Sequence, residues 1–247
     1  MAKHGKKYRA ALDKIEEGRL YGPKPAFTLL KEVDATAYDA TVECAFRLGI
    51  DPRKADQMVR GAISLPHGIG KSVTVAVVAG GDKAAEAREA GADHVGDDDL
   101  VEQLGAGELL SEIDSVIATP DMMGKLGRLG KVLGPRGLMP NPKSGTVTMD
   151  VAKAVTEIKA GRVEYRSDRN GNVHTILGKV SFGADQLVDN YATLLDELLR
   201  QRPSAAKGRY LRSVTISTSA SPGIPLDPSK SRDLVEDDED AAAAASA

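Results

Sequence analysis

Residues 72–81 read SVTVAVVAGG, an almost continuous apolar and β-branched run. Such a run is typical of a strand that is covered on both faces, as in a parallel sheet. Downstream, the sequence predicts helices over 82–90 and 98–104, near Asp121 and over 151–159, and strands at DHVG (93–96) and DSVIATP (114–120). Because strands and helices alternate tightly here, the segment is predicted to form a small parallel α/β domain.

The sequence on either side of this segment has a different pattern. TVECAFRL (41–48) alternates apolar and polar residues with a period of two, which predicts a half-buried strand. The other predicted elements are helices over 8–17, 26–32 and 184–201, a turn and helix in 51–61, strands at AISLP (62–66) and YLRSVTISTS (210–219), and a hairpin over 162–182 that turns at Asn170-Gly171. The flanks therefore resemble each other and differ from the middle.

We accordingly expect two fold classes, α/β and α+β, in one chain. A discontinuous α+β domain, residues 1–67 plus 160–226, should carry an inserted α/β domain, residues 68–159. Residues 227–247 contain too little apolar surface to pack and too much like charge, so we expect a disordered acidic tail.

Charge is distributed unevenly along the 247 residues, whose formal net charge is -3. Residues 1–67 hold 12 Lys and Arg against 9 Asp and Glu, and residues 160–226 hold 9 against 6. The middle segment holds 10 against 14, and the last 21 residues hold 2 against 7. Basic flanks beside an acidic middle point to a nucleic-acid face, although the excess is modest.

Several classes of protein are disfavoured. Cys44 is the only cysteine, which excludes an internal disulfide and a zinc site made of cysteines, and its place in the alternating strand predicts a buried core residue. The longest apolar run is too short to cross a bilayer, and no apolar signal core follows the basic start. We expect a cytoplasmic protein without a membrane partner.

An enzyme is the weaker hypothesis. HGIGKS (67–72) ends like a phosphate-binding loop, but Leu65 stands where that pattern needs glycine, and a strand follows where it needs a helix. AGGDKAAEAREAG (79–91) lacks the glycine spacing of a dinucleotide site. The four histidines have no metal-ligand spacing, and Asp97, Asp98 and Asp99 are explained by helix capping and the helix dipole. We therefore expect no cofactor, no metal and no small-molecule substrate; a nucleotide-dependent enzyme built on the inserted domain and a protein-interaction module remain the alternatives.

The stretch GKLGRLGKVLGPRGLMPNPKSG (124–145) favours RNA. Six of its 22 residues are glycine and three are proline, and none is acidic. We read it as a long loop whose glycines let a partner approach closely and whose cations contact phosphates: Lys125, Arg128, Lys131, Arg136 and Lys143. The chain contains no Trp and only 3 Phe, so structured RNA fits better than stacked single strands.

Three long motifs carry a family resemblance. KVLGPRGLMPNPKSGTVT, RLGIDPRKADQMVRGAISLPHGIGK upstream and YRSDRNGNVHTILGKVSF downstream are similar to the bacterial ribosomal protein L-one family, and the resemblance runs from about Lys6 to Gly223. It implies a discontinuous domain that binds 23S rRNA at the mobile stalk and an inserted Rossmann-like, three-layer α/β domain. It also implies help in releasing deacylated tRNA from the exit site, and translational repression of the protein's own operon through its mRNA. No catalytic activity or cofactor comes with it.

The resemblance also implies RNA-facing positions. They are Tyr38 and Thr41 at the start of a strand, Arg166, Asp168, Arg169 and His174 in the hairpin, and Ser217 and Thr218 in the last strand; Arg53 and Ser219, in or beside the matching stretches, are taken with them. Two departures stand out: Ala37 replaces a common lysine, and Ser219, Ala220 and Ser221 replace the usual Thr-Met-Gly. Loss of a buried Met side chain removes on the order of 1.5–3 kcal/mol of apolar burial.

Overall fold

A computed structural model describes residues 5–230, with the side chains of Ala55 and Lys143 left out. The chain divides into two compact units. Within the described range, unit 1 comprises residues 5–59, 65–70 and 165–230, and unit 2 comprises 60–64 and 71–164. These boundaries differ by a few residues from the predicted ones at 67/68 and 159/160.

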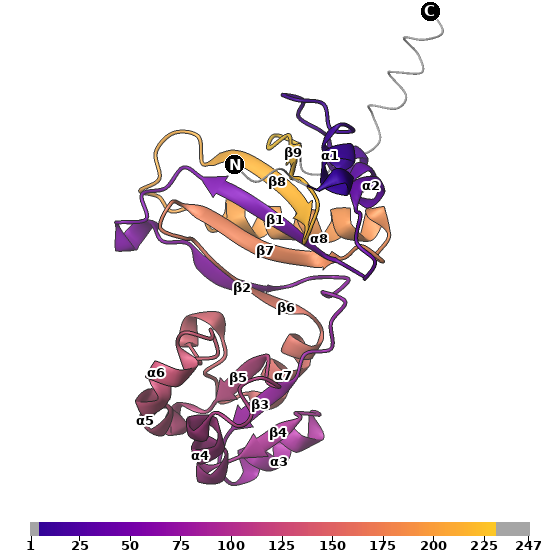
Figure 1. Cartoon of the computed structure of the whole chain (residues 1–247). Helices are drawn as coiled ribbons and strands as arrows, with labels where there is room; N and C mark the ends of the chain where they lie inside the picture. The colour runs from indigo at the N-terminus through magenta and orange to yellow at the C-terminus, as the bar shows by residue number, and fades with distance from the viewer. Residues whose placement is uncertain (1–4, 231–247) are drawn as a thin grey trace, which may run out of the picture. The chain divides into compact units, whose positions relative to one another are not determined.

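Unit 1 is built on a four-stranded antiparallel sheet with the order β7-β1-β8-β9 (Figure 1). Its elements are α1 (Lys6–Leu12), α2 (Pro23–Val33), β1 (Thr41–Leu48), the 3-10 turn η1 (Ala55–Gln57), β7 (Asn172–Lys179), α8 (Ala184–Arg200), β8 (Leu211–Thr218) and β9 (Ile224–Leu226). The strand predicted over 41–48 is confirmed at both ends. The long helix predicted over 184–201 is also confirmed, and it ends one residue earlier, at Arg200.

The core of unit 1 lies between one face of this sheet and the helices α2 and α8. Phe46 on β1 stacks on Tyr191 of α8 with ring centroids 6.0 Å apart, and Phe27 of α2 meets the same ring edge-on at 6.1 Å. Cys44 is buried on this face, as predicted, and burial raises the pKa of its thiol. Because one face of β1 is committed to this core, the alternate residues of the strand point to the other face.

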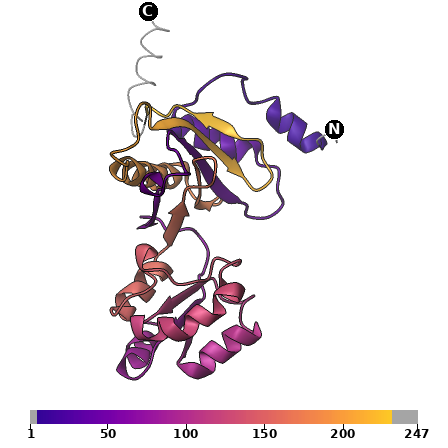
Figure 2. The same cartoon turned by 90° about the vertical axis from the view of Figure 1, so that its left-hand side faces the viewer.

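Unit 2 contains a three-stranded parallel sheet with the order β4-β3-β5, and helices lie on both sides of it (Figures 1 and 2). Its elements are β3 (Val75–Val78), α3 (Asp82–Glu89), β4 (His94–Gly96), α4 (Asp98–Ala106), β5 (Ser115–Ala118), η2 (Pro120–Met122), α5 (Met123–Leu126), η3 (Gly127–Leu129), α6 (Gly130–Leu133), η4 (Pro142–Ser144) and α7 (Val151–Lys159). The apolar run within residues 72–81 thus contains the central strand, β3, whose four residues are fully buried. The predicted α/β class is confirmed.

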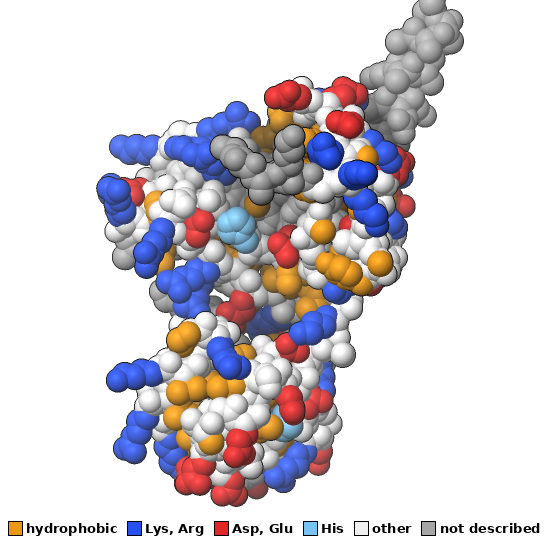
Figure 3. Space-filling view, viewed as in Figure 1, with side chains coloured by type: hydrophobic (Ala, Val, Ile, Leu, Met, Phe, Trp, Pro, Cys, Tyr) orange, Lys and Arg blue, Asp and Glu red, His pale blue; other side chains and the backbone are white. Residues whose placement is uncertain are grey.

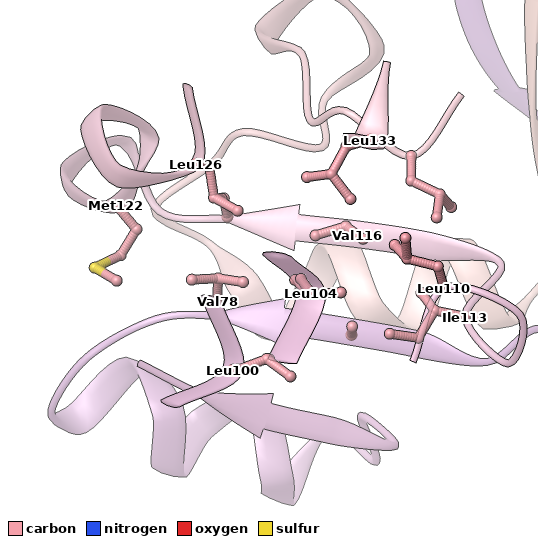
Figure 4. Packing of buried hydrophobic residues seen from close by; sticks show 12 residues of the cluster. Val78, Leu100, Leu104, Leu110, Ile113, Val116, Met122, Leu126 and Leu133 are labelled. Atoms are coloured by element: carbon pink, nitrogen blue, oxygen red, sulfur yellow. The ribbon is translucent and has the colours of Figure 1, made fainter. Parts of the chain in front are cut away.

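Two cores lie on opposite faces of this sheet. Val78 and Val116 pack with Leu104 of α4 and with Leu126 and Leu133 on one side (Figure 4). On the other side, Val75, Val77 and Ile117 pack with α3 and α7. Burial on both sides explains why the strand needs an unbroken apolar sequence rather than an alternating one.

The prediction of a long loop over 124–145 was wrong in its first half, which folds into α5, η3 and α6. Leu126 and Leu133 are fully buried, and each such burial contributes about 1.5–3 kcal/mol, which outweighs the low helix propensity of the glycines. The second half contains a tight turn, in which Asn141 N donates to Thr146 Oγ1 at 2.8 Å. Beyond it, Ala118 N donates to Thr146 O at 2.9 Å, so the chain continues alongside β5.

The predicted hairpin over 162–182 was also wrong, although its turn exists. Gly171 has φ +80°, and Gly171 N donates to Asp168 O. The two strands then separate: β6 (Arg162–Arg166) pairs with β2 (Arg60–Ser64) in a sheet of their own, while β7 pairs with β1. Ser167 N donates to Val59 O at 2.8 Å, which continues the β6 path beside the segment before β2.

Two smaller differences concern the edges of unit 1. The helix predicted over 8–17 ends at Leu12, and the predicted helix in 51–61 is a single 3-10 turn. Of the tail expected from Asp227 onward, residues 227–230 are hydrogen-bonded, since Asp227 N donates to Tyr21 O at 2.9 Å. The expected disorder therefore does not extend to these four residues, and residues 231–247 lie outside the described range.

Candidate nucleic-acid interface

The face of the antiparallel sheet opposite the core carries exposed and half-exposed side chains. On β1 these are Thr41, Glu43, Ala45 and Arg47. The strand register sets their neighbours: Glu43 lies between Ile176 and Ser217, Ala45 between His174 and Thr215, and Arg47 between Asn172 and Ser213. The face is therefore a pleated surface of mainly hydroxyl, imidazole and cationic groups, which also carries the carboxylate of Glu43 and the apolar side chains of Ala45 and Ile176.

The register separates the predicted RNA-facing residues of unit 1 into two groups. Tyr38, Thr41, Ser217, Thr218 and Ser219 lie where β1 begins and β8 ends. Arg53, Arg166, Asp168, Arg169 and His174 lie toward the opposite end, where β1 ends and β7 begins. Seven residue steps along β1 span roughly 23 Å between these ends. We call them the hydroxyl end and the arginine end.

The arginine end is formed by turns that meet one another. Leu48 N donates to Gly171 O at 2.9 Å, and Gly49 N donates to Tyr210 O, so the 167–171 turn and the start of β8 flank the end of β1. Its exposed cations are Arg47, Arg53, Lys54, Arg166, Arg169, Lys207, Arg209 and Arg212. In Figure 3, Lys and Arg side chains gather where Figure 1 places the end of β1. Closely spaced cations on an exposed surface are suited to phosphates.

Asp168 holds the turn at this end together. Its carboxylate accepts hydrogen bonds from Asn170 N at 2.8 Å and from Asn172 N at 2.7 Å, and Asn172 Nδ2 donates to it at 3.0 Å. Burial alone would raise the pKa of Asp168, but these hydrogen bonds outweigh it and, with the nearby His174, hold the pKa below its usual value. Asp168 thus positions Arg169 and His174, and its oxygens are already engaged within the turn.

The hydroxyl end is partly accessible. Tyr38 is 63% exposed, Ser217 is half-buried and Ser219 is exposed. Thr41 Oγ1 accepts a hydrogen bond from Lys179 Nζ at 2.9 Å, so its outward hydroxyl lies beside a cation. These groups can donate to or accept from ribose hydroxyls and phosphate oxygens.

Thr218 does not fit its predicted RNA-facing place. It is only 4% exposed, because it continues the core-facing series of Val214 and Ile216 on β8. Its Oγ1 donates to Asp34 Oδ1 at 2.8 Å, and its backbone N donates to Ser221 Oγ at 2.8 Å. The residue therefore supports the end of the strand from beneath, and Ser217 presents the outward hydroxyl.

The cations of residues 124–145 in unit 2 are less available than their sequence suggested. Lys125 Nζ donates to Asp98 and lies 3.7 Å from Asp97, and these partners raise its pKa. Arg136 Nη1 donates to Leu110 O at 2.9 Å. Arg128 and Lys131 are exposed, while the Lys143 side chain lies outside the described part. Asp97 is the N-cap residue of α4 and Asp98 and Asp99 lie in its first turn, as predicted, but the Asp97 side chain makes no capping hydrogen bond.

Sequence reasoning missed several cations of the arginine end. Arg47 follows from the strand alternation, which places it on the outward face with Thr41. Three further cations lie just before β8 or at its start: Lys207, Arg209 and Arg212. No local pattern connects them with the 167–171 turn. Only the pairing of β8 with β1 brings them to the same place.

The geometry of the alternative enzyme site does not favour a nucleotide. A crevice of about 540 Å³ lies at the carboxyl ends of β3 and β4, where α/β sheets bind ligands. Asp97 and Asp99 line it, and Asp97 Oδ2 lies 3.0 Å from the place a Cβ on Gly80 would take. Carboxylates repel phosphates at the position where a dinucleotide site needs open backbone.

Two further observations concern metals and membranes. Within residues 5–230, no group of three or more His, Cys, Asp and Glu side chains is placed to hold a metal ion. None of the described helices combines the length and the apolar character needed to cross a bilayer.

Comparison with known proteins identifies close relatives. The model of the family described as "Ribosomal protein L1p/L10e family" matches residues 30–222. The "Large ribosomal subunit protein uL1" of Kitasatospora aureofaciens is 59% identical over 240 residues, which cover 97% of this chain and 99% of the relative. The protein of the same name from Thermobifida fusca is 59% identical over 234 residues (95% and 99%), and that from Cutibacterium acnes is 58% identical over 231 (94% and 99%).

Proposed function

This chain belongs to the ribosomal protein L1p/L10e family, and from that premise we propose that it binds the 23S rRNA stalk through the open sheet face of unit 1. As a family member it is a structural, RNA-binding protein of the large ribosomal subunit in the cytoplasm rather than an enzyme. Its place on the rRNA and its further partners belong to the proposal.

The observation that carries the proposal is the arrangement of the two ends of the sheet. The arginine end offers exposed cations on three adjoining turns, which suit the closely spaced phosphates of a folded RNA. The hydroxyl end offers Tyr38, Thr41 and Ser217, which suit ribose hydroxyls. In this proposal residues 1–67 and 160–226 form the rRNA-binding domain.

Two further roles are proposed from the family resemblance. Arg128 and Lys131 are exposed on unit 2 and suit phosphates of the deacylated tRNA at the exit site, whose release the protein would assist. The operon mRNA would bind the same sheet face of unit 1 and so be repressed. An excess of the stalk fragment should then displace the mRNA from the protein.

The test of the main proposal is a binding series with the full chain. A 23S rRNA stalk fragment should bind more tightly than a hairpin of equal length and scrambled sequence. Its log affinity should fall linearly as log salt rises, because each neutralised phosphate releases counterions. Equal affinity for the two RNAs, or an affinity that salt does not change, would contradict the proposal.

A further inference from the structure

A groove of about 740 Å³ lies in unit 1, away from the residues assigned to RNA. It is formed by the segment that joins α1 to α2, the first turns of α2 and Lys230. Four cations line it: Lys14, Arg19, Lys24 and Lys230. Leu20, 57% exposed, and Leu29 supply apolar surface, and the acidic lining residues are Glu16 and Glu32. The groove lining thus combines apolar side chains with a net positive charge.

The cations of the groove are held by contacts that can be exchanged. Arg19 lies over the ring of Tyr21 at 5.0 Å and pairs with Glu16 at 2.8 Å, which fixes its guanidinium at the wall. Lys24 pairs with Asp185 at 3.3 Å. Exposed pairs of this kind contribute little to stability, so a segment with several carboxylates can compete for these cations.

The chain leaves the described range at the wall of this groove. Tyr21 N donates to Pro225 O at 3.1 Å, and Asp227 N donates to Tyr21 O at 2.9 Å, so β9 is tied to the groove-forming segment. A turn follows, in which Ser229 N donates to Asp227 Oδ1 at 2.9 Å and Lys230 N donates to Asp227 O at 3.2 Å. The turn brings Lys230 into the groove lining.

The next residues have the chemistry that the groove would accept. Residues 231–247 hold six Asp and Glu against the single base Arg232. The apolar pair Leu234-Val235 comes first, and five consecutive acidic residues, 236–240, follow it. Both kinds of side chain match the groove lining, which combines leucines with lysine and arginine side chains.

We propose that residues 233–240 bind in this groove, with Leu234 and Val235 against Leu20 and Leu29 and the carboxylates 236–240 against Lys14, Arg19 and Lys24. Six residues from Lys230 reach roughly 20 Å when extended, which is enough to cross the groove. A short tether gives an effective concentration of about 1 mM, so even a dissociation constant of that size leaves the groove half occupied. The segment would thereby shield these cations from unspecific contact with RNA.

The test uses the full chain with a paramagnetic label at Ser246→Cys. Cys44 is 1% exposed and stays unlabelled. We expect selective broadening of the amide signals of Arg19, Leu20 and Leu29 at about 0.1 M salt, and its loss at about 1 M, where the Debye length falls to about 3 Å. Neutralising residues 236–240 to Asn and Gln should abolish the broadening, as should Lys14→Glu with Lys24→Glu.

A matched control carries the same charge change outside the groove. Lys54→Glu with Lys207→Glu alters two exposed lysines at the arginine end and should leave the broadening unchanged. No broadening at low salt, or broadening that survives Lys14→Glu with Lys24→Glu, would overturn the proposal. A mixture of spin-labelled protein with an isotope-labelled copy that carries no spin label gives a further test. Broadening of the amide signals of that copy would also overturn the proposal, since the occupant would then come from a second chain. Each result is obtained without RNA, so none depends on the ribosomal role.

Discussion

The lysine and arginine side chains of the arginine end in unit 1 and of residues 124–145 in unit 2 have different surroundings. The arginine end of unit 1 carries exposed arginines from distant parts of the chain: Arg47, Arg53, Arg166 and Arg169. In unit 2, the basic stretch 124–145 looked richer because no acidic residue interrupts it. Yet Lys125 is paired with Asp98, and Arg136 is bonded to Leu110 O.

The difference arises from how each sheet is covered. One face of the unit 1 sheet lies against helices, so its outward residues and turns are free to display charge. The unit 2 sheet is covered on both faces, and α5 and α6 must bury leucines to form one of those layers. In this layer Lys125 of α5 lies beside the acidic start of α4.

The largest effect is expected when two cations are removed from the arginine end of unit 1. Arg47→Ala with Arg169→Ala should lower the slope of log affinity for the rRNA stalk fragment against log salt by about two. At about 0.1 M salt this corresponds to roughly tenfold weaker binding for each lost phosphate contact. Affinity is measured by filter binding or fluorescence anisotropy over a salt series.

The control for this prediction is Arg128→Ala with Lys131→Ala, which removes the same charge from unit 2. These two residues are as exposed as the first pair, so the control should leave the slope nearly unchanged. Equal losses in the two double variants would mean that charge alone, and not its place on the sheet, determines binding.

The second prediction separates a buried from an outward hydroxyl on the same strand. Thr218→Val leaves Asp34 Oδ1 without its hydrogen bond and should lower the free energy of unfolding by about 1–3 kcal/mol. Ser217→Val changes a half-buried outward residue and should alter stability by no more than about 0.5 kcal/mol while weakening RNA binding. Urea unfolding and RNA titration of both variants measure the two effects.

If Thr218→Val proved as stable as the unsubstituted chain and lost only RNA affinity, Thr218 would belong to the RNA-facing surface after all. The Asp34 contact would then contribute nothing to folding. Ser217→Val is the suitable partner for this comparison because the two residues are adjacent and differ mainly in the face they occupy.

Local patterns predicted the elements whose burial follows a fixed period. The alternation in 41–48 and the unbroken apolar run ending at Val78 identified one half-buried and one buried strand. The partners of those strands could not be predicted, because pairing depends on residues far apart in the chain. Thus β6 and β7 looked like one hairpin around Gly171 but belong to two sheets.

The same limit applies to the candidate site. The family resemblance identified Arg169 and His174 as candidates, but whether a side chain is exposed depends on the face it occupies and on its neighbours. Two residues show this directly. Thr218 faces the core and is bonded to Asp34, and Lys125 is paired with a carboxylate from another helix, Asp98.

The third prediction releases a paired cation in unit 2. Asp98→Asn removes the main partner of Lys125 and should raise the affinity of the full chain for deacylated tRNA, the RNA proposed for the unit 2 cations, by a few-fold. Asp99→Asn is the matched control, since it removes the same charge from the first turn of α4, while the ion pairs of Lys125 are to Asp97 and Asp98. The difference between the two variants, taken from RNA titrations at low salt, isolates the release of Lys125. Identical affinities would show that the pair does not limit access to this lysine.

The smallest expected effect concerns the carboxylate that orders the turn beneath Arg169. Hydrogen bonds hold the pKa of Asp168 in the folded chain below its value of about 3.9 in unfolded peptides. A depressed folded pKa means that Asp168 stabilises the fold at pH values above about 4, and that this contribution is lost as pH falls through the folded pKa. Asp168→Asn should therefore be less stable than the unsubstituted chain near neutral pH, and the gap should narrow on acidification.

The measurement is the difference in urea midpoint between the two proteins from neutral pH to about pH 3, a range in which unpaired Asp and Glu side chains also protonate. Taking the difference removes those shared changes. Asp56→Asn, at an exposed residue of η1, supplies a second reference whose gap should not follow the same course. A gap for Asp168→Asn that stays constant through this range would mean that the turn is held by its backbone and by Gly171, with no contribution from the charge on Asp168. The arginine end would then keep its geometry independently of the one acidic residue that the resemblance placed among its cations.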